Sequence, residues 1–350
     1  MLRLIKGLTS PTVKRAVITT GLEISSLLDS LGLAGGTRGR GAIFTLHHVR
    51  RPLARPFHPN DILEVTPEFL DGALMTLRKG GYDFIRLEEL PDRLASASSQ
   101  PFACFTLDDG NRNNRTDAAP VFTRHDAPFT IFLTRGFIEQ THSLWWETLE
   151  VLLNRAPSID FDFGLGTEPV PAATPDQKLA AYRRITDFVS TTDEARAVEQ
   201  LDAEARRHGI DPLAITRDLM MRADELRALA ADPLVSYGAH TVSHRGLARL
   251  PESEARREIV ESIHAVSAMT GKTANAFAYT YGDARSVSAR ERQILRDLGM
   301  RIGVTTRPGV ITSDLLSDMT ALPRISLNGL YQKSRYVRAL ASGIPFRVMR

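Results

Sequence analysis

Two adjacent carboxylates, Asp108 and Asp109, stand directly after an apolar run and directly before Gly110. The run, residues 102–107 (FACFTL), is short and β-prone, which is typical of a strand buried on both faces. Carboxylates side by side at the end of such a strand repel each other and lose solvent, so they need a cation or a shared proton. Gly110 permits the sharp turn that would direct both side chains to one place. The competing interpretation is a helix N-cap, because Asp is favoured there and a helix-like stretch follows.

A second strand-like run, residues 234–239 (LVSYGA), ends in two histidines four residues apart, His240 and His244. Residues at this spacing share one face of a helical turn. A single histidine after a strand is more often a hydrogen-bonded structural residue, whereas a pair at this spacing favours a metal site. One aspartate and two histidines would leave coordination positions open to water, as a catalytic metal site requires.

The segments FTLDDG and HTVSH together resemble the first two motifs of the polysaccharide deacetylases, the NodB homology domain of carbohydrate esterase family 4. The resemblance extends over about residues 42–327 and implies a distorted (β/α)7 TIM-like barrel. Carried over position by position, it implies that Asp108 is the catalytic base and that Asp109, His240 and His244 bind a divalent metal. Zinc is the expected ion, with cobalt, nickel and manganese as alternatives.

The third motif of the family, usually Arg-x-Pro-Tyr, is altered here to residues 278–281, Ala-Tyr-Thr-Tyr. The arginine that orients the base must then come from elsewhere in the chain, and Arg324 on the last predicted strand is the candidate. Tyr281 keeps the motif's final position, where backbone N–H groups could stabilise a tetrahedral oxyanion. The change from proline to Thr280 leaves the position of the Tyr281 amide open.

The residue that would serve as general acid must also come from another part of the chain. The family's late Leu-x-His motif is absent here, and no histidine follows His264. His264 lies in the middle of a predicted helix and is expected at the surface. In family members with an early Tyr-His-x-Val segment, that histidine is thought to fill the vacant role. The matching residues 46–49 read Leu-His-His-Val, which places His47 in the motif position. Strand alternation directs His47 and His48 to opposite faces, so His48 is the alternative acid, and both could instead be structural.

Strands alternate with helices along most of the chain, which predicts parallel βα units. Barrel active sites form at the carboxyl ends of such strands, where the candidate residues fall. The predicted strands are residues 42–49, 83–87, 102–107, 128–134, 234–239, 274–279, 301–305 and 322–327. The predicted helices between and after them are residues 67–79, 88–95, 115–125, 252–269 and 288–298.

Residues from about 138 to 220 interrupt this alternation and are interpreted as a helical insertion in the barrel. Two helix-like segments, 176–189 and 193–207, follow a loop rich in Gly, Pro and Thr at residues 163–174. Long insertions on such scaffolds often shape the substrate cleft. The neighbouring Trp145 and Trp146 are expected to pack the insertion onto the barrel, and a sugar-stacking platform is the alternative for one of them.

The chain divides into an N-terminal helical segment with a linker (1–41), the barrel (42–330) and a basic C-terminal tail (331–350), the last expected to be a solvated helix face. Hydrophobic content is 43%, charged content 24% and net charge +3, so no nucleic-acid footprint is indicated. Ser, Thr, Pro and Gly interrupt the N-terminal apolar residues, which predicts neither a signal peptide nor a transmembrane helix. A lone cysteine, Cys104, fits a reducing compartment, so a cytoplasmic location is expected. An N-terminal helix lying on a membrane surface is the alternative for residues 11–33.

The resemblance implies a hydrolase of non-peptide carbon–nitrogen bonds that removes the N-acetyl group of an amino sugar. A chitooligosaccharide or a poly-N-acetylglucosamine-like chain is the expected substrate. Two other functions stay open: an amidase acting on a small amide, and a catalytically inactive carbohydrate-binding homologue, which the altered third motif makes plausible. Oligomeric state is not indicated by the sequence.

Overall fold

The computed structural model describes residues 11–33 and 36–348. The first ten residues of the predicted N-terminal segment, and residues 34–35 of the predicted linker, therefore lie outside the described residues. The main sheet contains β1 (Gly41–Leu46), β4 (Asp83–Phe84), β5 (Phe102–Leu107), β6 (Phe129–Leu133), β9 (Val235–Ala239), β10 (Ala276–Ala278), β11 (Ile302–Val304) and β12 (Ile325–Ser326).

The main sheet is parallel throughout, with the order β11-β10-β9-β6-β5-β1-β12 and with β4 paired to the start of β5. Val304 at the end of β11 forms a parallel bridge with Leu322, just ahead of β12, so the two ends of the order approach each other. The sheet is therefore curled, and the predicted distorted (β/α) barrel is confirmed. Each residue of β5 is buried, as expected for a strand covered on both faces.

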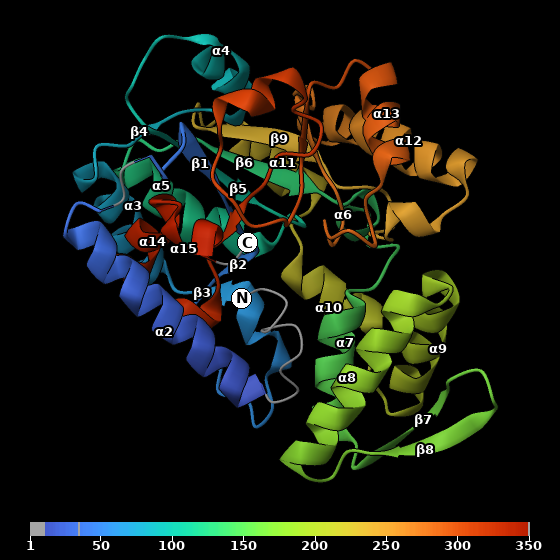
Figure 1. Ribbon diagram of the computed structural model, residues 1–350. Helices are drawn as coiled ribbons and strands as arrows, with labels where there is room; N and C mark the ends of the chain where they lie inside the picture. The colour runs from blue at the N-terminus through green and yellow to red at the C-terminus, as the bar shows by residue number, and fades with distance from the viewer. Residues whose placement is uncertain (1–10, 34–35, 349–350) are drawn as a thin grey trace.

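Helices cover the outside of the sheet (Figure 1). They are α3 (Pro67–Lys79), α4 (Leu90–Ala95), α5 (Ala119–Arg124), α6 (Arg135–Ile138), α11 (Ala223–Leu229), α12 (Glu252–Thr270) and α13 (Ala289–Asp297). α3 begins as predicted, with Thr66 accepting a hydrogen bond from the Phe69 amide and Pro67 in the first turn. Its inner face contributes Leu70, Leu74 and Leu77 to the barrel core.

The predicted insertion forms a separate lobe beside the sheet, coloured green to yellow in Figure 1. It consists of α7 (Trp145–Arg155), α8 (Pro175–Thr191), α9 (Glu194–Arg207) and α10 (Pro212–Leu219), together with an antiparallel hairpin of β7 (Ser158–Asp162) and β8 (Thr167–Pro171). Its buried side chains form a hydrophobic cluster distinct from the barrel core. The hairpin replaces part of the loop predicted for residues 163–174, where Gly164 and Gly166 in the left-handed region make the turn.

The N-terminal and C-terminal helices pack together on one side of the barrel. α2 (Pro11–Ser30) contacts both α14 (Ser334–Ala341) and α15 (Ile344–Val348), and α14 also contacts α3. The basic residues Arg335 and Arg338 of α14 are about half exposed, as expected for a solvated face, while its other face buries Tyr336 and Val337. Among the described helices, none has the length and apolarity needed to cross a bilayer.

Strand boundaries differ most from the prediction around His47. The predicted strand 42–49 is divided into β1 and a two-residue β2 (His48–Val49), which leaves the sheet to pair with β3 (Glu64–Val65). His47 occupies the break, so its side chain is set by a change of direction in the chain and not by strand alternation alone. The predicted strand 83–87 is shorter, because a 3₁₀ turn at Leu87–Glu89 precedes α4.

Candidate active site

The carboxyl ends of the parallel strands bring most of the predicted site residues to one edge of the barrel, and the Arg324 side chain reaches them from the start of β12. Asp108 and Asp109 follow β5, His240 follows β9, and Tyr281 lies three residues beyond β10. Arg324 immediately precedes β12, and His47 follows β1. The structure thus gathers these residues from five segments of the chain.

Asp109, His240 and His244 form a buried cluster whose ligand atoms all lie within 4.8 Å of one another. Asp109 Oδ1 is 3.5 Å from His240 Nε2 and 3.4 Å from His244 Nε2. Two ligands of one ion, each bound at about 2.1 Å in a tetrahedral arrangement, are separated by about 3.4 Å. Asp109 Oδ1 is also a buried oxygen with no hydrogen-bond partner among the described residues. Distances, donor types and the unpartnered oxygen all fit a divalent metal.

The two histidines are held in different ways. His240 Nδ1 lies 2.7 Å from the Ala278 carbonyl oxygen and must donate to it, which leaves the Nε2 lone pair facing Asp109. Burial lowers the pKa of His240 to about 4, so the ring is neutral at neutral pH, as a metal ligand must be. The ring of His244 is instead held by aromatic neighbours, Phe137 at 5.5 Å and Trp146 at 5.0 Å between centroids.

Asp108 faces Arg324 and not the metal cluster. The guanidinium donates from two nitrogens to the two carboxylate oxygens, at 2.8 and 2.7 Å, and its Nε donates to the Thr305 carbonyl at 2.9 Å. Burial alone would raise the pKa of Asp108, but the charge of Arg324 holds it below the usual range. Asp108 is therefore ionised and oriented. The residue predicted to contact Asp108, Arg324, is thus its ion-pair partner.

Of the two adjacent histidines, His47 lies at the cluster. Its Nε2 atom is 4.0 Å from Asp108 Oδ2, and a quarter of the side chain is exposed. His48 points away, with Nδ1 accepting from the Asn113 amide at 2.9 Å and Nε2 at 3.8 Å from Glu147 of α7. Burial lowers the pKa of His48 well below its usual range. Only His47 has both solvent access and a catalytic neighbour.

The Tyr281 loop is fastened by the insertion, through residues that sequence reasoning did not select. The Tyr281 hydroxyl accepts from Trp145 Nε1 at 3.1 Å and donates in a short hydrogen bond to Glu194, the first residue of α9. Glu194 also accepts from the Gly246 amide at 3.0 Å and from Arg249 at 2.6 Å. The amide N–H of Tyr281 has no hydrogen-bond partner within the described part of the chain. That donor is thus free for a ligand.

Strained backbone is concentrated in these loops. Six non-glycine residues among those described have positive φ, and four belong to the site: Asp109 (78°), Thr241 (67°), His244 (61°) and Tyr281 (57°). Such conformations cost roughly 1–3 kcal/mol each and persist where surrounding contacts enforce them. Gly110 follows at φ 89°, a backbone conformation that residues with a side chain rarely adopt.

The expectation that His240 and His244 share one face of a helical turn is wrong. Residues 240–246 are not helical, because Thr241 and His244 adopt left-handed backbone angles. The loop is shaped instead by Glu258 of α12, which accepts from the Val242 and Ser243 amides at 2.8 and 2.9 Å. Local contacts thus bring the Nε2 atoms together without the helix that the spacing predicts.

Trp145 and Trp146 are both buried in the core of the insertion, as the packing interpretation expected. Two surface hollows adjoin the site. One of about 490 Å³ is lined by His244, Trp145 and Glu258, and one of about 350 Å³ by Tyr281, Trp145 and Arg249. Trp145 lines both hollows, although the residue is only 7% exposed.

The sequence was also compared with models of known protein families. The family model described as polysaccharide deacetylase matches residues 176–303. The match contains His240, His244 and Tyr281, begins after the aspartates of β5 and ends before Arg324. It confirms the predicted resemblance and supports the predicted enzyme class, a hydrolase acting on carbohydrate N-acyl groups. A search of curated proteins found no match.

Solved structures of deacetylases share the fold. The deacetylase PplD of Streptococcus pyogenes, in complex with acetate, is 16% identical with a TM-score of 0.54, covering 83% of this chain and 92% of that one. IcaB of Ammonifex degensii is 17% identical with a TM-score of 0.54, covering 87% and 98%. A polysaccharide deacetylase of Bacillus cereus is 15% identical with a TM-score of 0.53, covering 87% and 68%. At these identities the likeness establishes the fold alone.

Proposed function

We propose that this chain is a metal-dependent deacetylase that hydrolyses the N-acetyl group of an amino sugar in a polysaccharide or oligosaccharide. The single observation that carries the proposal is the pairing of two buried clusters. Asp109, His240 and His244 offer three neighbouring ligand atoms, and the adjacent Asp108 is held ionised by Arg324. The family match and the deacetylase fold support the same reaction.

The donor set favours zinc, because neutral imidazole nitrogens and a carboxylate are its usual ligands at catalytic sites. Asp109, His240 and His244 would hold the ion. When bound, a divalent ion supplies Lewis acidity toward a carbonyl oxygen and makes water easier to deprotonate. The unpartnered, buried Asp109 oxygen is the observation in this structure that supports such an ion.

The chain's own residues divide the proton transfers of amide hydrolysis. The ionised Asp108 would accept the proton of the attacking water, and Arg324 keeps its carboxylate oriented for that task. The free N–H of Tyr281 would donate to the oxygen of the tetrahedral intermediate. His47 would give a proton to the departing amine, which is a poor leaving group without one.

The proposed substrate is a chitooligosaccharide or a chain similar to poly-N-acetylglucosamine. The structure of PplD was determined with acetate, the product that this reaction would release. The hollows beside Trp145 provide space for a sugar next to the cluster. Arg324 supplies the guanidinium that the altered third motif lacks, which favours an active enzyme over an inactive carbohydrate-binding homologue.

Acetate release from a panel of N-acetylated oligosaccharides tests this proposal. The wild-type chain should release acetate in a metal-dependent manner, whereas Asp108→Asn should lose at least about a hundredfold in kcat, as expected when a general base is removed. Asp108→Asn should retain its metal, since Asp108 is not a ligand. Wild-type turnover in the Asp108→Asn variant would contradict the assignment, and metal-loaded wild-type protein that releases no acetate from any member of the panel would contradict the function.

A further inference from the structure

The outer face of α2 carries an apolar stripe that no described residue covers. Val13, Ile24, Leu27 and Leu31 are 46%, 54%, 60% and 64% exposed. Intervals of eleven, three and four residues place Val13, Ile24 and Leu27 of α2, and Leu31 in the turn directly after it, on one side. Figure 1 shows α2 as the long blue helix lying across the outside of the molecule.

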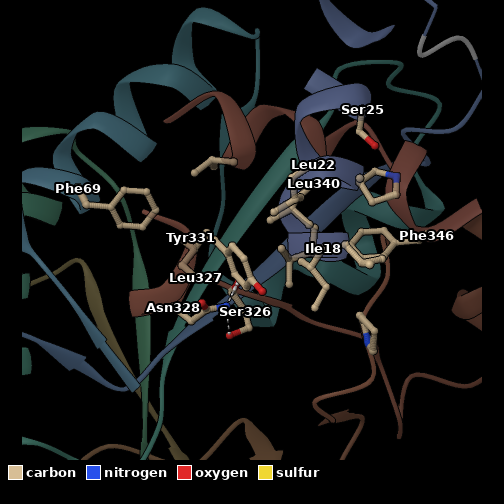
Figure 2. A pocket seen from close by; sticks show the side chains of 16 residues that line it. Ile18, Leu22, Ser25, Phe69, Ser326, Leu327, Asn328, Tyr331, Leu340 and Phe346 are labelled. Atoms are coloured by element: carbon tan, nitrogen blue, oxygen red, sulfur yellow. Dashed lines mark hydrogen bonds between the residues drawn. The ribbon is translucent and has the colours of Figure 1, made fainter. Parts of the chain in front are cut away.

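The opposite face of α2 covers an apolar pocket of about 190 Å³. Figure 2 shows Ile18 and Leu22 of α2 facing Leu340 and Phe346 across this pocket. Since α2 is apolar on two opposite sides and the body covers only one, the outer stripe is not explained by packing within the chain. A helix of this kind needs a second apolar surface.

The pocket also shows which end of the barrel α2 adjoins. Its wall includes Ser326 and Asn328 at the carboxyl end of β12 (Figure 2). Ser326 pairs with Thr45, and His47 leaves the sheet two residues after Thr45. The middle of α2 therefore lies beside the edge of the barrel that holds the candidate active site.

The charge of the N-terminal sequence favours an anionic partner. Arg3, Lys6, Lys14 and Arg15 precede the first acidic residue of the chain, Glu23. The two acidic residues of α2 are already paired with α14: Glu23 with Arg335 at 2.7 Å and Asp29 with Arg338 at 2.5 Å. A second copy of α2 would offer no free carboxylate to these cations, whereas anionic lipid headgroups would meet them while the acyl region received the stripe.

We propose that α2 docks the protein on the surface of an anionic phospholipid bilayer, with Val13, Ile24, Leu27 and Leu31 inserted at the level of the headgroups and upper acyl chains. This goes beyond the deacetylase function and does not depend on it. Docking through α2 would hold the active-site edge of the barrel close to the membrane, where a sugar attached to a lipid or to the cell envelope is found.

Co-sedimentation of the full chain with vesicles tests the proposal. We expect binding to vesicles of equal parts phosphatidylglycerol and phosphatidylcholine, and much weaker binding to phosphatidylcholine alone. Ile24→Gln/Leu27→Gln/Leu31→Gln should weaken binding at least about tenfold, because each change removes an inserted apolar side chain. Lys14→Glu/Arg15→Glu should weaken binding to the anionic vesicles selectively.

Leu165→Gln/Leu298→Gln/Leu316→Gln is the matched control, since it removes three exposed leucines elsewhere on the molecule and should leave binding unchanged. Sedimentation velocity on the same samples distinguishes a bilayer from a second copy. A wild-type dimer that the stripe variant converts to monomers, without vesicle binding, would overturn the proposal. So would equal vesicle binding by the wild type and the stripe variant, or a monomeric wild type that binds no vesicles.

Discussion

Asp108 and Asp109 are neighbours in sequence, yet they face different partners, and this difference separates their proposed roles. Arg324 neutralises Asp108 from one side, while Asp109 faces two imidazoles from another. The left-handed backbone at Asp109 directs the two side chains apart. The repulsion expected between adjacent buried carboxylates is thereby relieved by two separate cationic partners, one fixed and one proposed to be a metal.

His47 and His48 provide a test at the same scale. His47→Ala should lower kcat and remove the basic limb of the pH–rate profile, because the proton donor near Asp108 is lost. His48→Ala should leave that limb in place, since His48 faces Asn113 and Glu147 and not the cluster. Metal content, measured on both variants, should equal that of the wild type. The reverse pattern would assign the role of general acid to His48. If neither substitution changed kcat or the pH–rate profile, neither histidine would be the general acid.

Glu147 is a buried acid whose ionisation should oppose folding. Burial raises its pKa to about 7, and the nearby Glu150 adds to the shift while Arg50 opposes it. Between the ordinary value near 4.5 and this value, the folded chain holds a proton that the unfolded chain has released. Stability is therefore lost as pH rises through this interval, by up to about 1.4 kcal/mol per unit of pKa shift.

Glu147→Gln keeps the shape of the side chain and cannot ionise. Its Tm should match that of the wild type near pH 5 and exceed it above pH 7, as measured by thermal unfolding at both values. Glu199→Gln on the exposed face of α9 is the control and should show no such pH dependence. A difference between Glu147→Gln and the wild type that is the same at both pH values would show that Glu147 does not titrate in this range.

At the scale of elements, the insertion fixes the loops that carry the site. Trp146 of α7 packs on the ring of His244, and Glu194 of α9 joins the Tyr281 loop to the loop after His244. These contacts fasten the Tyr281 loop to α9 and the His244 ring to α7. The insertion thus has a structural role in the site beyond shaping a cleft.

Glu194→Ala should show this coupling. It leaves the Tyr281 hydroxyl, the Gly246 amide and Arg249 without their shared acceptor, which should cost about 1–3 kcal/mol of stability or more. kcat should also fall, because the Tyr281 amide is no longer held in place, while metal content stays unchanged. Glu199→Ala, on the exposed face of α9, is the control for stability and should leave Tm unchanged. A folded Glu194→Ala protein with the kcat of the wild type would show that the insertion does not position Tyr281 for catalysis.

An element could be predicted where the residues that determine its structure are close together in the sequence. The β5 strand was predictable from a run of consecutive apolar residues, and the start of α3 from the adjacent Thr66 and Pro67. The loop carrying His240 and His244 was mispredicted as a helical turn, because Glu258, eighteen residues after His240, determines its backbone. Glu194 could not be selected from sequence, since nothing in an acidic helix marks one carboxylate as buried.

For the whole molecule, the alternation of strands and helices predicted parallel βα units, and the family resemblance implied the curled barrel that the strand order shows. The assignment of Arg324 to Asp108 depended on the resemblance, and the structure places the two in contact across 216 residues of sequence. A helix over residues 11–33 was expected from the sequence, but only the packed structure shows which of its apolar sides is covered.

The most direct test of the account is the metal content of the purified chain, measured by elemental analysis together with acetate release. The wild type should contain about one divalent ion per chain, and His240→Ala and His244→Ala should each lose both the ion and the activity. His264→Ala, on the exposed face of α12, should retain both. Full metal content in the His240→Ala and His244→Ala proteins would contradict the central claim that these histidines and Asp109 form the metal site.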